Sequence, residues 1–384
     1  MRELYIGLMS GTSLDGVDGV LVEESSRVIA HSYAPFPVAL RQEFLALNTS
    51  GNDEIHRAAL AGNALARMYA QVVSRLLADA KVAKGDVTAI GAHGQTVRHR
   101  PQEFDVGGPS TGPCANDGAG GYTVQLNNPA MLAELTGIDV VADFRCRDVA
   151  AGGQGAPLVP AFHQAVFGQA HDAVAVLNIG GISNITLLPP LDLEPAGDVI
   201  GFDCGPGNAL MDHWCHQHTG QAFDSGGHWA ASGQVNEGLL QALLDEPYFT
   251  KLPPKSTGRD LFNVPWLTRK QAGFNKLAPV DVQATLTELT ASACVTCITS
   301  YGVDSKQLIV CGGGALNTYL LERLQARLQQ MTVTTSQAFG LPPLQVEAAA
   351  FAWLARKAIR RETGSLPKVT GTQGARILGA IYPA

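Results

Sequence analysis

The sequence has few charged residues and no long apolar run, and these absences exclude several classes of protein. Charged residues make up 16% of the 384 positions, and no apolar run reaches the roughly 18 residues that a membrane helix needs. The first residues enter strand-like sequence at once and show no signal-peptide core, so we expect a cytoplasmic protein that does not contact a membrane. The seven cysteines are scattered, which favours free thiols in a reducing compartment.

Basic residues are too few for a general nucleic-acid-binding protein. The chain has 34 acidic and 27 basic residues and a formal net charge of −7, so we expect no nucleic-acid partner. Glycine is abundant, at 42 residues, but has no three-residue period, which excludes a collagen-like fibre. Hydrophobic residues at 46% are enough for a chain of this length to fold into two or three domains.

Several common catalytic motifs are also missing. The sequence contains no Walker A pattern, which excludes P-loop chemistry, and no G-x-G-x-x-G that opens a helix after a strand. It also has no G-x-S-x-G nucleophile elbow. Any nucleotide site in this chain must therefore be built from other glycine turns.

The sequence twice shows a strand, a turn of small residues and a second strand. The first pair comprises residues 4–9 and 17–22 around a glycine-rich turn, and the second comprises 173–179 and 182–188 around Gly180 and Gly181. This similarity hints at two related halves. Helices are predicted at 53–80, 281–301 (with Asp281 as N-cap), 317–328 and 344–360, and further strands at 87–90, 138–142 and 307–311. Strands and helices alternate, so the fold class is α/β.

The first turn can be interpreted in two ways. Its glycines, hydroxyls and free backbone amides could wrap a phosphate, and Asp15 and Asp18 beside it could hold Mg²⁺ directly or through water. An ordinary hairpin with an Asp-Gly turn would explain the same residues. Two further glycine turns after strands, at Gly180–Gly181 and Gly312–Gly314, favour a nucleotide site.

Two groups of polar residues are candidates for chemistry. Asp203 precedes a Gly-Pro-Gly turn and could act as a general base, or it could cap the helix that starts near Asn208. Arg145 and Arg147 could clamp a carboxylate, or could form surface ion pairs with the neighbouring Asp143 and Asp148. Two other patterns favour ordinary packing over a metal or redox role, namely the histidines of residues 213–218 and the C-x-x-C of residues 294–297.

A set of motifs along the whole chain resembles the anhydro-N-acetylmuramic acid kinase family. The resemblance rests on residues 9–18, 94–96, 143–145, 148–160, 201–208, 254–259, 311–314 and 379–383. It implies an actin-like ATPase (ribonuclease H-like) fold with two α/β domains and a central nucleotide cleft. We expect domain I to contain residues 1–143 and 372–384, and domain II residues 144–371.

The resemblance also implies a reaction. The family opens the 1,6-anhydro ring of 1,6-anhydro-N-acetylmuramic acid with water and phosphorylates O6, which gives N-acetylmuramate 6-phosphate and ADP during cell-wall recycling. Asp203 would be the base that activates water. ATP and Mg²⁺ are the implied cofactors, with Asp15 and Asp18 as the metal-binding residues, and a homodimer is expected.

The implied binding residues fall in two sets. Those for ATP are Gly11, Thr12, Ser13, Leu14, Asp15, Gly16, Val17, Asp18, Gly180, Gly181, Gly312, Gly313 and Gly314. Those for the sugar are Ser13, Thr96, Phe144, Arg147, Gln154 and Glu347, with Arg147 opposite the lactyl carboxylate.

Two features depart from the family pattern. Residues 107–121, which we interpret as a mobile surface loop, look like an insertion near the place where the sugar would enter, and Cys146 stands where a basic residue is expected. Two other functions remain alternatives. One is an ordinary sugar kinase that acts on a free hydroxyl, and the other is an ATP-gated binding protein related to actin or to heat-shock chaperones.

Overall fold

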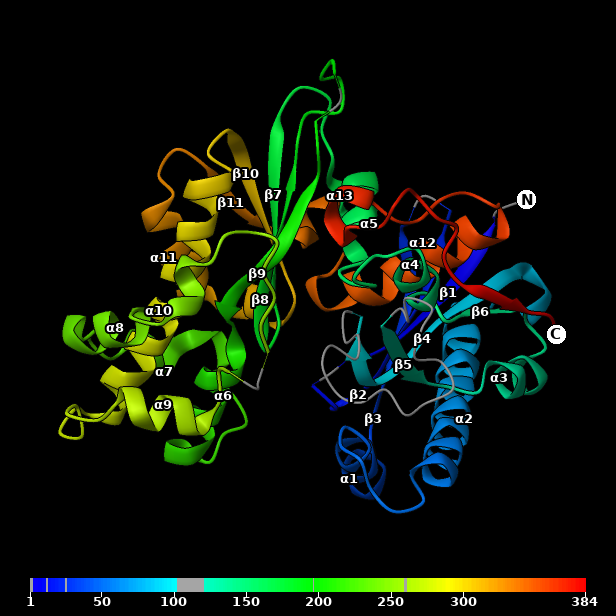
Figure 1. Ribbon diagram of the computed structural model, residues 1–384, viewed down its shortest axis with the longest axis horizontal. Helices are drawn as coiled ribbons and strands as arrows, with labels where there is room; N and C mark the ends of the chain where they lie inside the picture. The colour runs from blue at the N-terminus through cyan, green and yellow to red at the C-terminus, as the bar shows by residue number, and fades with distance from the viewer. Residues whose placement is uncertain (1–2, 12, 25, 102–120, 196, 259–260) are drawn as a thin grey trace, which may run out of the picture. The chain divides into compact units, whose positions relative to one another are not determined.

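The chain folds into two compact units. The computed structural model describes residues 3–11, 13–24, 26–101, 121–195, 197–258 and 261–384 (Figure 1). The first unit comprises Met1–Phe162 and Glu347–Ala384, and the second comprises His163–Val346. The sequence analysis placed these boundaries at 143/144 and 371/372. The described residues do not include Thr12 or residues 107–120 of the predicted loop at 107–121.

The first unit contains a seven-stranded mixed sheet. Its order is β12-β6-β4-β1-β2-β3, and β5 pairs with β4. The pairs β1–β2 and β2–β3 are antiparallel, whereas β1–β4 and β4–β6 are parallel. The strands are β1 (Leu4–Ser10), β2 (Gly16–Glu23), β3 (Val28–Pro35), β4 (Val87–Arg100), β5 (Tyr122–Leu126), β6 (Val140–Ala142) and β12 (Ala380–Tyr382).

The second unit repeats this topology in a five-stranded sheet. Its order is β11-β10-β7-β8-β9, with β7–β8 and β8–β9 antiparallel and β7–β10 and β10–β11 parallel. The same five-strand arrangement therefore occurs in both units, and the predicted α/β class with two domains is confirmed. The strands are β7 (Ala173–Ile179), β8 (Ile182–Leu188), β9 (Ile200–Pro206), β10 (Ser305–Cys311) and β11 (Thr332–Thr335).

The four predicted helices are present within a few residues of their expected bounds. They are α2 (Glu54–Ala80), α10 (Pro279–Tyr301), α11 (Thr318–Arg327) and α12 (Val346–Ile359). The other α-helices are α1 (Val38–Ala46), α3 (Pro129–Thr136), α4 (Cys146–Ala150), α5 (Val159–Phe167), α6 (Asn208–Thr219), α7 (His228–Ala231), α8 (Glu237–Leu244), α9 (Val264–Lys270) and α13 (Pro367–Thr370).

Helix α12 belongs to the first unit because it packs directly on the sheet of that unit. A Cβ atom at Gly7 would lie 1.8 Å from the carbonyl oxygen of Ala348, and one at Gly91 would lie 2.0 Å from that of Phe351. Only glycine permits this close approach of β1 and β4 to the helix. On the other face of the sheet, Gly19 faces α2. The contacts of α12 explain why the second boundary lies at 346/347.

Helix α10 forms the centre of the core in the second unit and begins earlier than predicted. Its N-cap is Ala278, with Pro279 as the first helical residue, a position that proline favours. The prediction of Asp281 as N-cap is therefore wrong. The Asp281 carboxylate instead accepts a hydrogen bond from the Gln234 amide at 2.8 Å. Although α10 is long, the described residues include no helix that is both long and apolar enough to cross a membrane.

Candidate active site

The turn between β1 and β2 is closed by its own polar groups. The Asp15 carboxylate accepts hydrogen bonds from Ser13 Oγ at 2.7 Å and from the Gly16 amide at 3.0 Å, and the Leu14 amide donates to Gly11 O at 3.2 Å. The side chains of Leu14 and Val17 are buried in the core. These two residues can therefore offer only backbone groups to a ligand.

Acidic side chains lie close to this turn within the first unit. Asp18 Oδ1 lies 3.1 Å from His31 Nε2. Glu347, at the start of α12, is an exposed residue, but desolvation of its carboxyl by the surrounding protein raises its pKa. The Arg145 guanidinium opposes this rise, while Asp18 and Asp15 add to it. The first unit thus brings Asp15, Asp18 and Glu347 into one electrostatic environment.

Two of the predicted sugar-binding residues differ in exposure. Thr96 lies in β4 and is half-buried, and its Oγ1 accepts a hydrogen bond from Gln125 Nε2 at 3.2 Å. Phe144 is only 1% exposed, and its ring centroid lies 5.4 Å from that of Phe351. Phe144 therefore packs in the hydrophobic core against α12.

Arg145 and Arg147 have different environments. Arg145 donates to His93 Nε2 from Nε at 3.1 Å and to Gly155 O at 2.7 Å, and burial lowers the pKa of Arg145 to about 10. Arg147 is exposed on α4, and within the described part of the chain it has no hydrogen bond or ion pair. Arg147 is thus available to a ligand, whereas Arg145 is already held.

The surface ion pairs considered from the sequence are absent among the described residues. The Asp148 carboxylate is fully buried and accepts from Thr370 Oγ1 and from the Gly155 amide, both at 2.8 Å. The half-buried Gln154 is held by its own amide, which donates to Thr370 O at 2.7 Å. Asp148 therefore ties the loop around Gln154 to α13 and forms no direct ion pair with an arginine of the described residues.

The glycine turns of the second unit meet around Asn208. The Asn208 amide donates to Gly180 O at 2.8 Å, and its Nδ2 donates to Ile179 O at 3.1 Å. A Cβ atom at Gly313 would lie 3.2 Å from this side-chain nitrogen, and one at Gly207 would lie 2.3 Å from Gly180 O. The turns at 180–181, 205–207 and 312–314 thus form one surface rich in backbone groups.

Asp203 lies in β9 and does not cap the following helix. The N-cap of α6 is Gly207. One carboxylate oxygen of Asp203, Oδ2, accepts from Ser256 Oγ at 2.9 Å and from the Thr257 amide at 3.0 Å. Burial raises the pKa of Asp203, and these two hydrogen bonds oppose the rise. The capping alternative is therefore wrong, while the geometry and the raised pKa agree with a general base.

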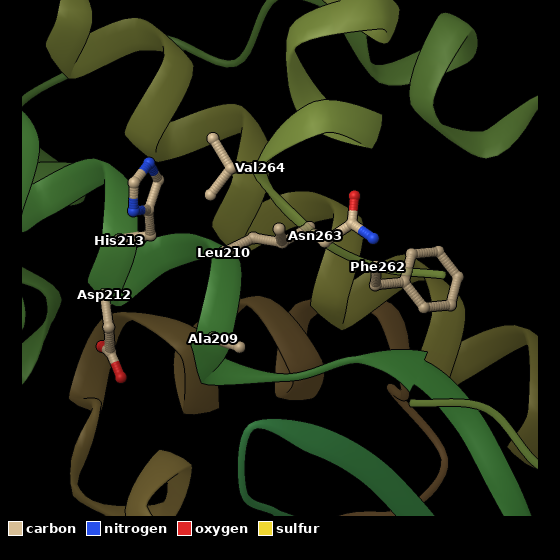
Figure 2. Close-up of a pocket in the computed structure, with 7 residues that line it drawn as sticks. All are labelled: Ala209, Leu210, Asp212, His213, Phe262, Asn263 and Val264. Atoms are coloured by element: carbon tan, nitrogen blue, oxygen red, sulfur yellow. The ribbon is translucent and has the colours of Figure 1, made fainter. Parts of the chain in front are cut away.

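A pocket of about 320 Å³ lies between α6 and the start of α9. Figure 2 shows its apolar side chains, among them Leu210 and Val264, with Asp212 directed away from them. None of the predicted site residues lines this pocket. Its lining residues are Ala209, Leu210, Asp212, His213, Phe262, Asn263 and Val264.

The remaining sequence motifs differ in burial, because His216 and His218 are exposed whereas the two cysteines of the C-x-x-C are buried. Cys294 and Cys297 are buried free thiols on α10, and the Trp214 and His218 rings lie 4.1 Å apart. The described residues contain no group of three or more His, Cys, Asp or Glu side chains that could hold a metal ion. The metal alternative at the histidines of residues 213–218 therefore finds no support.

The sequence analysis gave no role to several residues that the structure places near these sites. His93 is buried, and burial lowers its pKa to about 3, so it is neutral and can accept from Arg145. Tyr69 is buried beside the first turn. The sequence analysis did not single out Tyr69, and only its hydrogen-bond partners reveal its position.

Comparison with known proteins identifies the family. Residues 3–384 match the model of the family described as anhydro-N-acetylmuramic acid kinase. The chain is 63% identical over 402 residues to the anhydro-N-acetylmuramic acid kinase of Albidiferax ferrireducens, covering 100% of both chains, and 64% identical over 385 residues to that of Variovorax paradoxus, covering 100% of this chain and 99% of the other. Among solved structures, the activator of the 2-hydroxyisocaproyl-CoA dehydratase from Clostridium difficile is 11% identical with a TM-score of 0.48, covering 94% of this chain and 96% of that one. On the family model and these relatives, the chain belongs to the anhydro-N-acetylmuramic acid kinase family.

Proposed function

We propose that this kinase uses ATP and water to convert 1,6-anhydro-N-acetylmuramic acid into N-acetylmuramate 6-phosphate and ADP in peptidoglycan recycling. The observation that carries the proposal is the environment of Asp203. Its carboxylate is held at one oxygen by Ser256 and Thr257, and burial raises its pKa, as is common for a general base.

Asp203 begins the reaction by removing a proton from water. The resulting hydroxide attacks the anomeric carbon, and the bond from that carbon to the bridging O6 breaks. The released O6 attacks the γ-phosphorus of ATP, the bond to the bridging oxygen of the β-phosphate breaks, and ADP leaves. Positioning of these groups supplies most of the catalysis in the phosphoryl transfer.

Glycine turns are the residues that we assign to the nucleotide. The phosphates would contact the turn from Gly11 to Asp18, including Thr12, and the Gly180–Gly181 turn. The adenosine would lie along Gly312–Gly314. This assignment is supported by the joining of the second-unit turns around Asn208 and by the free backbone groups that such turns offer.

Asp15 and Asp18 fit a site for Mg²⁺. Both lie beside the first turn and keep solvent-accessible carboxylates. Two carboxylates suit Mg²⁺, which keeps several waters and also binds substrate phosphates. When bound, the ion would neutralise charge on the phosphate oxygens.

The sugar would contact Ser13, Thr96, Phe144, Gln154 and Glu347. For its lactyl carboxylate we propose the exposed Arg147, because that guanidinium has no hydrogen bond or ion pair in the described part of the chain. The homodimer, the cytoplasmic location and the domain boundaries at 143/144 and 371/372 stay predictions.

Isotope labelling tests the reaction as a whole. The protein is incubated with MgATP and 1,6-anhydro-N-acetylmuramic acid in ¹⁸O-labelled water, and products are sampled early, because the free sugar slowly exchanges its anomeric oxygen. We expect N-acetylmuramate 6-phosphate with label at the anomeric oxygen, formed in equal amount to ADP. An untouched anhydro-sugar together with phosphorylation of an ordinary sugar would favour the simple sugar kinase. ATP turnover that needs no sugar would favour the binding protein.

A further inference from the structure

Three buried groups form a closed set of hydrogen bonds at the end of β1. Tyr69 Oη lies 3.0 Å from Ser10 Oγ, and the Gly94 amide donates to Tyr69 Oη at 3.1 Å. Ser10 Oγ donates in turn to Gly94 O at 3.0 Å. The side chains of Tyr69 and Ser10 are 0% and 1% exposed. Every polar group in this set therefore depends on the other two.

The direction of each hydrogen bond follows from the number of protons. Ser10 has one hydroxyl proton, and Gly94 O receives it. Tyr69 must therefore donate its own proton to Ser10 Oγ while it accepts from the Gly94 amide. Burial raises the pKa of Tyr69 well above its usual range, so the phenol keeps this proton. A phenylalanine at this position would leave the Gly94 amide buried without its partner.

A bulge in β4 places Gly94 and Gln95 beside this set. Leu8 pairs with Ala92 but Ser10 pairs with Gln95, so β4 has one extra residue here. Gly94 has a φ of +81°, and a Cβ atom on it would lie 2.8 Å from the Leu126 carbonyl oxygen. Only glycine fits this position. Bulges of this kind redirect the neighbouring side chains.

Gln95 connects the bulge to the turn that follows β1. Its side chain is 0% exposed, and its Nε2 donates to Gly11 O at 3.1 Å and to Thr96 O at 3.3 Å. Gly11 opens the turn that we assign to the ATP phosphates, and Thr96 is a residue that we assign to the sugar. The buried hydrogen bonds thus join the two assigned segments.

We propose that Ser10, Tyr69 and Gln95 are positioning residues that keep the phosphate turn and Thr96 in one fixed register. This role rests on the proposed function, because it presumes that one segment holds ATP and the other the sugar. The fixed register aligns O6 with the γ-phosphorus. An error of about 1 Å in such an alignment can cost about 100-fold in rate.

A purely structural role would give a different pattern of effects. Loss of a buried hydrogen bond that only stabilises the fold lowers the folded fraction and leaves the kcat of folded protein unchanged. Loss of alignment lowers kcat in fully folded protein and allows γ-phosphoryl transfer to water. The ratio of ADP to phosphorylated sugar, together with kcat and KM, separates the two roles.

The test compares Tyr69→Phe and Gln95→Met with the control Tyr5→Phe. Tyr5 lies in the same strand as Ser10, is 1% exposed, and donates to Glu3 at 2.9 Å, away from the turn. We expect both network variants to lose about 10- to 100-fold in kcat with the KM for ATP within about threefold. We also expect them to release more ADP than phosphorylated sugar. The control should keep the wild-type kcat and a ratio of one.

Thermal unfolding of all three variants establishes that folded protein is compared. The proposal is overturned if both network variants keep kcat within threefold of wild type and a ratio of one, and Gln95→Met decides the matter alone if Tyr69→Phe does not fold. Wild-type protein that fails to phosphorylate the anhydro-sugar would refute the proposed function, and this role with it.

Discussion

Removal of the Ser256 hydroxyl should shift the acid limb of the pH–rate profile. Ser256 Oγ and the Thr257 amide both donate to Asp203 Oδ2, and both favour the ionised carboxylate and lower its pKa. In Ser256→Ala, one of these donors is lost and the pKa of Asp203 rises. A hydrogen bond to a charged group contributes about 1.5–3 kcal/mol, and solvent at the exposed Ser256 replaces part of this.

A net loss of about 0.7–1.4 kcal/mol corresponds to a rise of about 0.5–1 unit in the pKa of Asp203. A general base must be ionised, so kcat/KM falls as pH drops through its pKa. The acid limb of kcat/KM should therefore move to higher pH by about 0.5–1 unit, while the plateau changes little.

The assay is ADP release between pH 4 and 8 with the anhydro-sugar at low concentration. Ser232→Ala is the matched control, because the exposed Ser232 hydroxyl donates to the Trp229 carbonyl at 2.7 Å and has no contact with Asp203. Its acid limb should coincide with that of wild type. An unmoved limb in Ser256→Ala, or a shift to lower pH, would refute the assignment of Asp203 as the titrating base.

Three further predictions concern stability and nucleotide binding. Glu288→Gln should lower the free energy of unfolding by about 2 kcal/mol, because the 1% exposed Glu288 pairs with two half-exposed arginines of α11. Urea unfolding measures this change, and a loss below about 0.5 kcal/mol would contradict the prediction. Burial lowers the pKa of His163 to about 3, so this histidine takes up a proton between pH 7 and 5 only in the unfolded protein. The free energy of unfolding should therefore fall by about 2 kcal/mol as the pH drops from 7 to 5. His163→Asn should weaken that pH dependence, and an unchanged slope would count against it. Gly207→Ala should weaken ATP binding at least tenfold by calorimetry, because its Cβ would clash with Gly180 O, and unaltered affinity would remove these turns from the nucleotide site.

Local patterns predicted most of the elements because each depends on nearby residues. The apolar spacing of α2 is a property of its own sequence, and it gave bounds within one residue of Glu54–Ala80. The two strand pairs were equally visible, and the repeated sheet topology agrees with two related halves. The N-cap of α10 was predicted at the wrong residue because aspartate is a common N-cap, whereas the helix starts earlier, at Pro279.

The candidate site was only partly predictable, because its partners lie far apart in the sequence. From its sequence context Asp203 could be a base or a cap. The N-cap of α6 at Gly207 excludes the cap, and the donors Ser256 and Thr257 lie 53 and 54 residues away from Asp203 in the sequence. Tyr69 was not singled out from the sequence, because its hydrogen bond to Ser10 depends on how α2 packs on the sheet. Such pairings depend on the packing of separate elements, which no short motif records.

The grouping of α12 also depends on contacts between distant parts of the chain. The sequence analysis placed residues 347–371 in domain II, and that boundary stays a prediction. Their contacts with Gly7 and Gly91 hold α12 against the first sheet, and the structure groups Glu347 onward with the first unit. The missing side chains of these glycines permit the contact, and nothing in the local pattern of α12 identifies its partner.

The proposed role of Asp203 is tested most directly by Asp203→Asn. Asparagine keeps the size of the side chain but cannot accept a proton from water. We expect turnover of the anhydro-sugar to fall by about 10²–10⁴-fold, the usual contribution of a general base. We expect ATP affinity, measured by calorimetry, to stay within about threefold of wild type, because the glycine turns are unchanged. Substantial turnover by a folded Asp203→Asn protein would contradict the account.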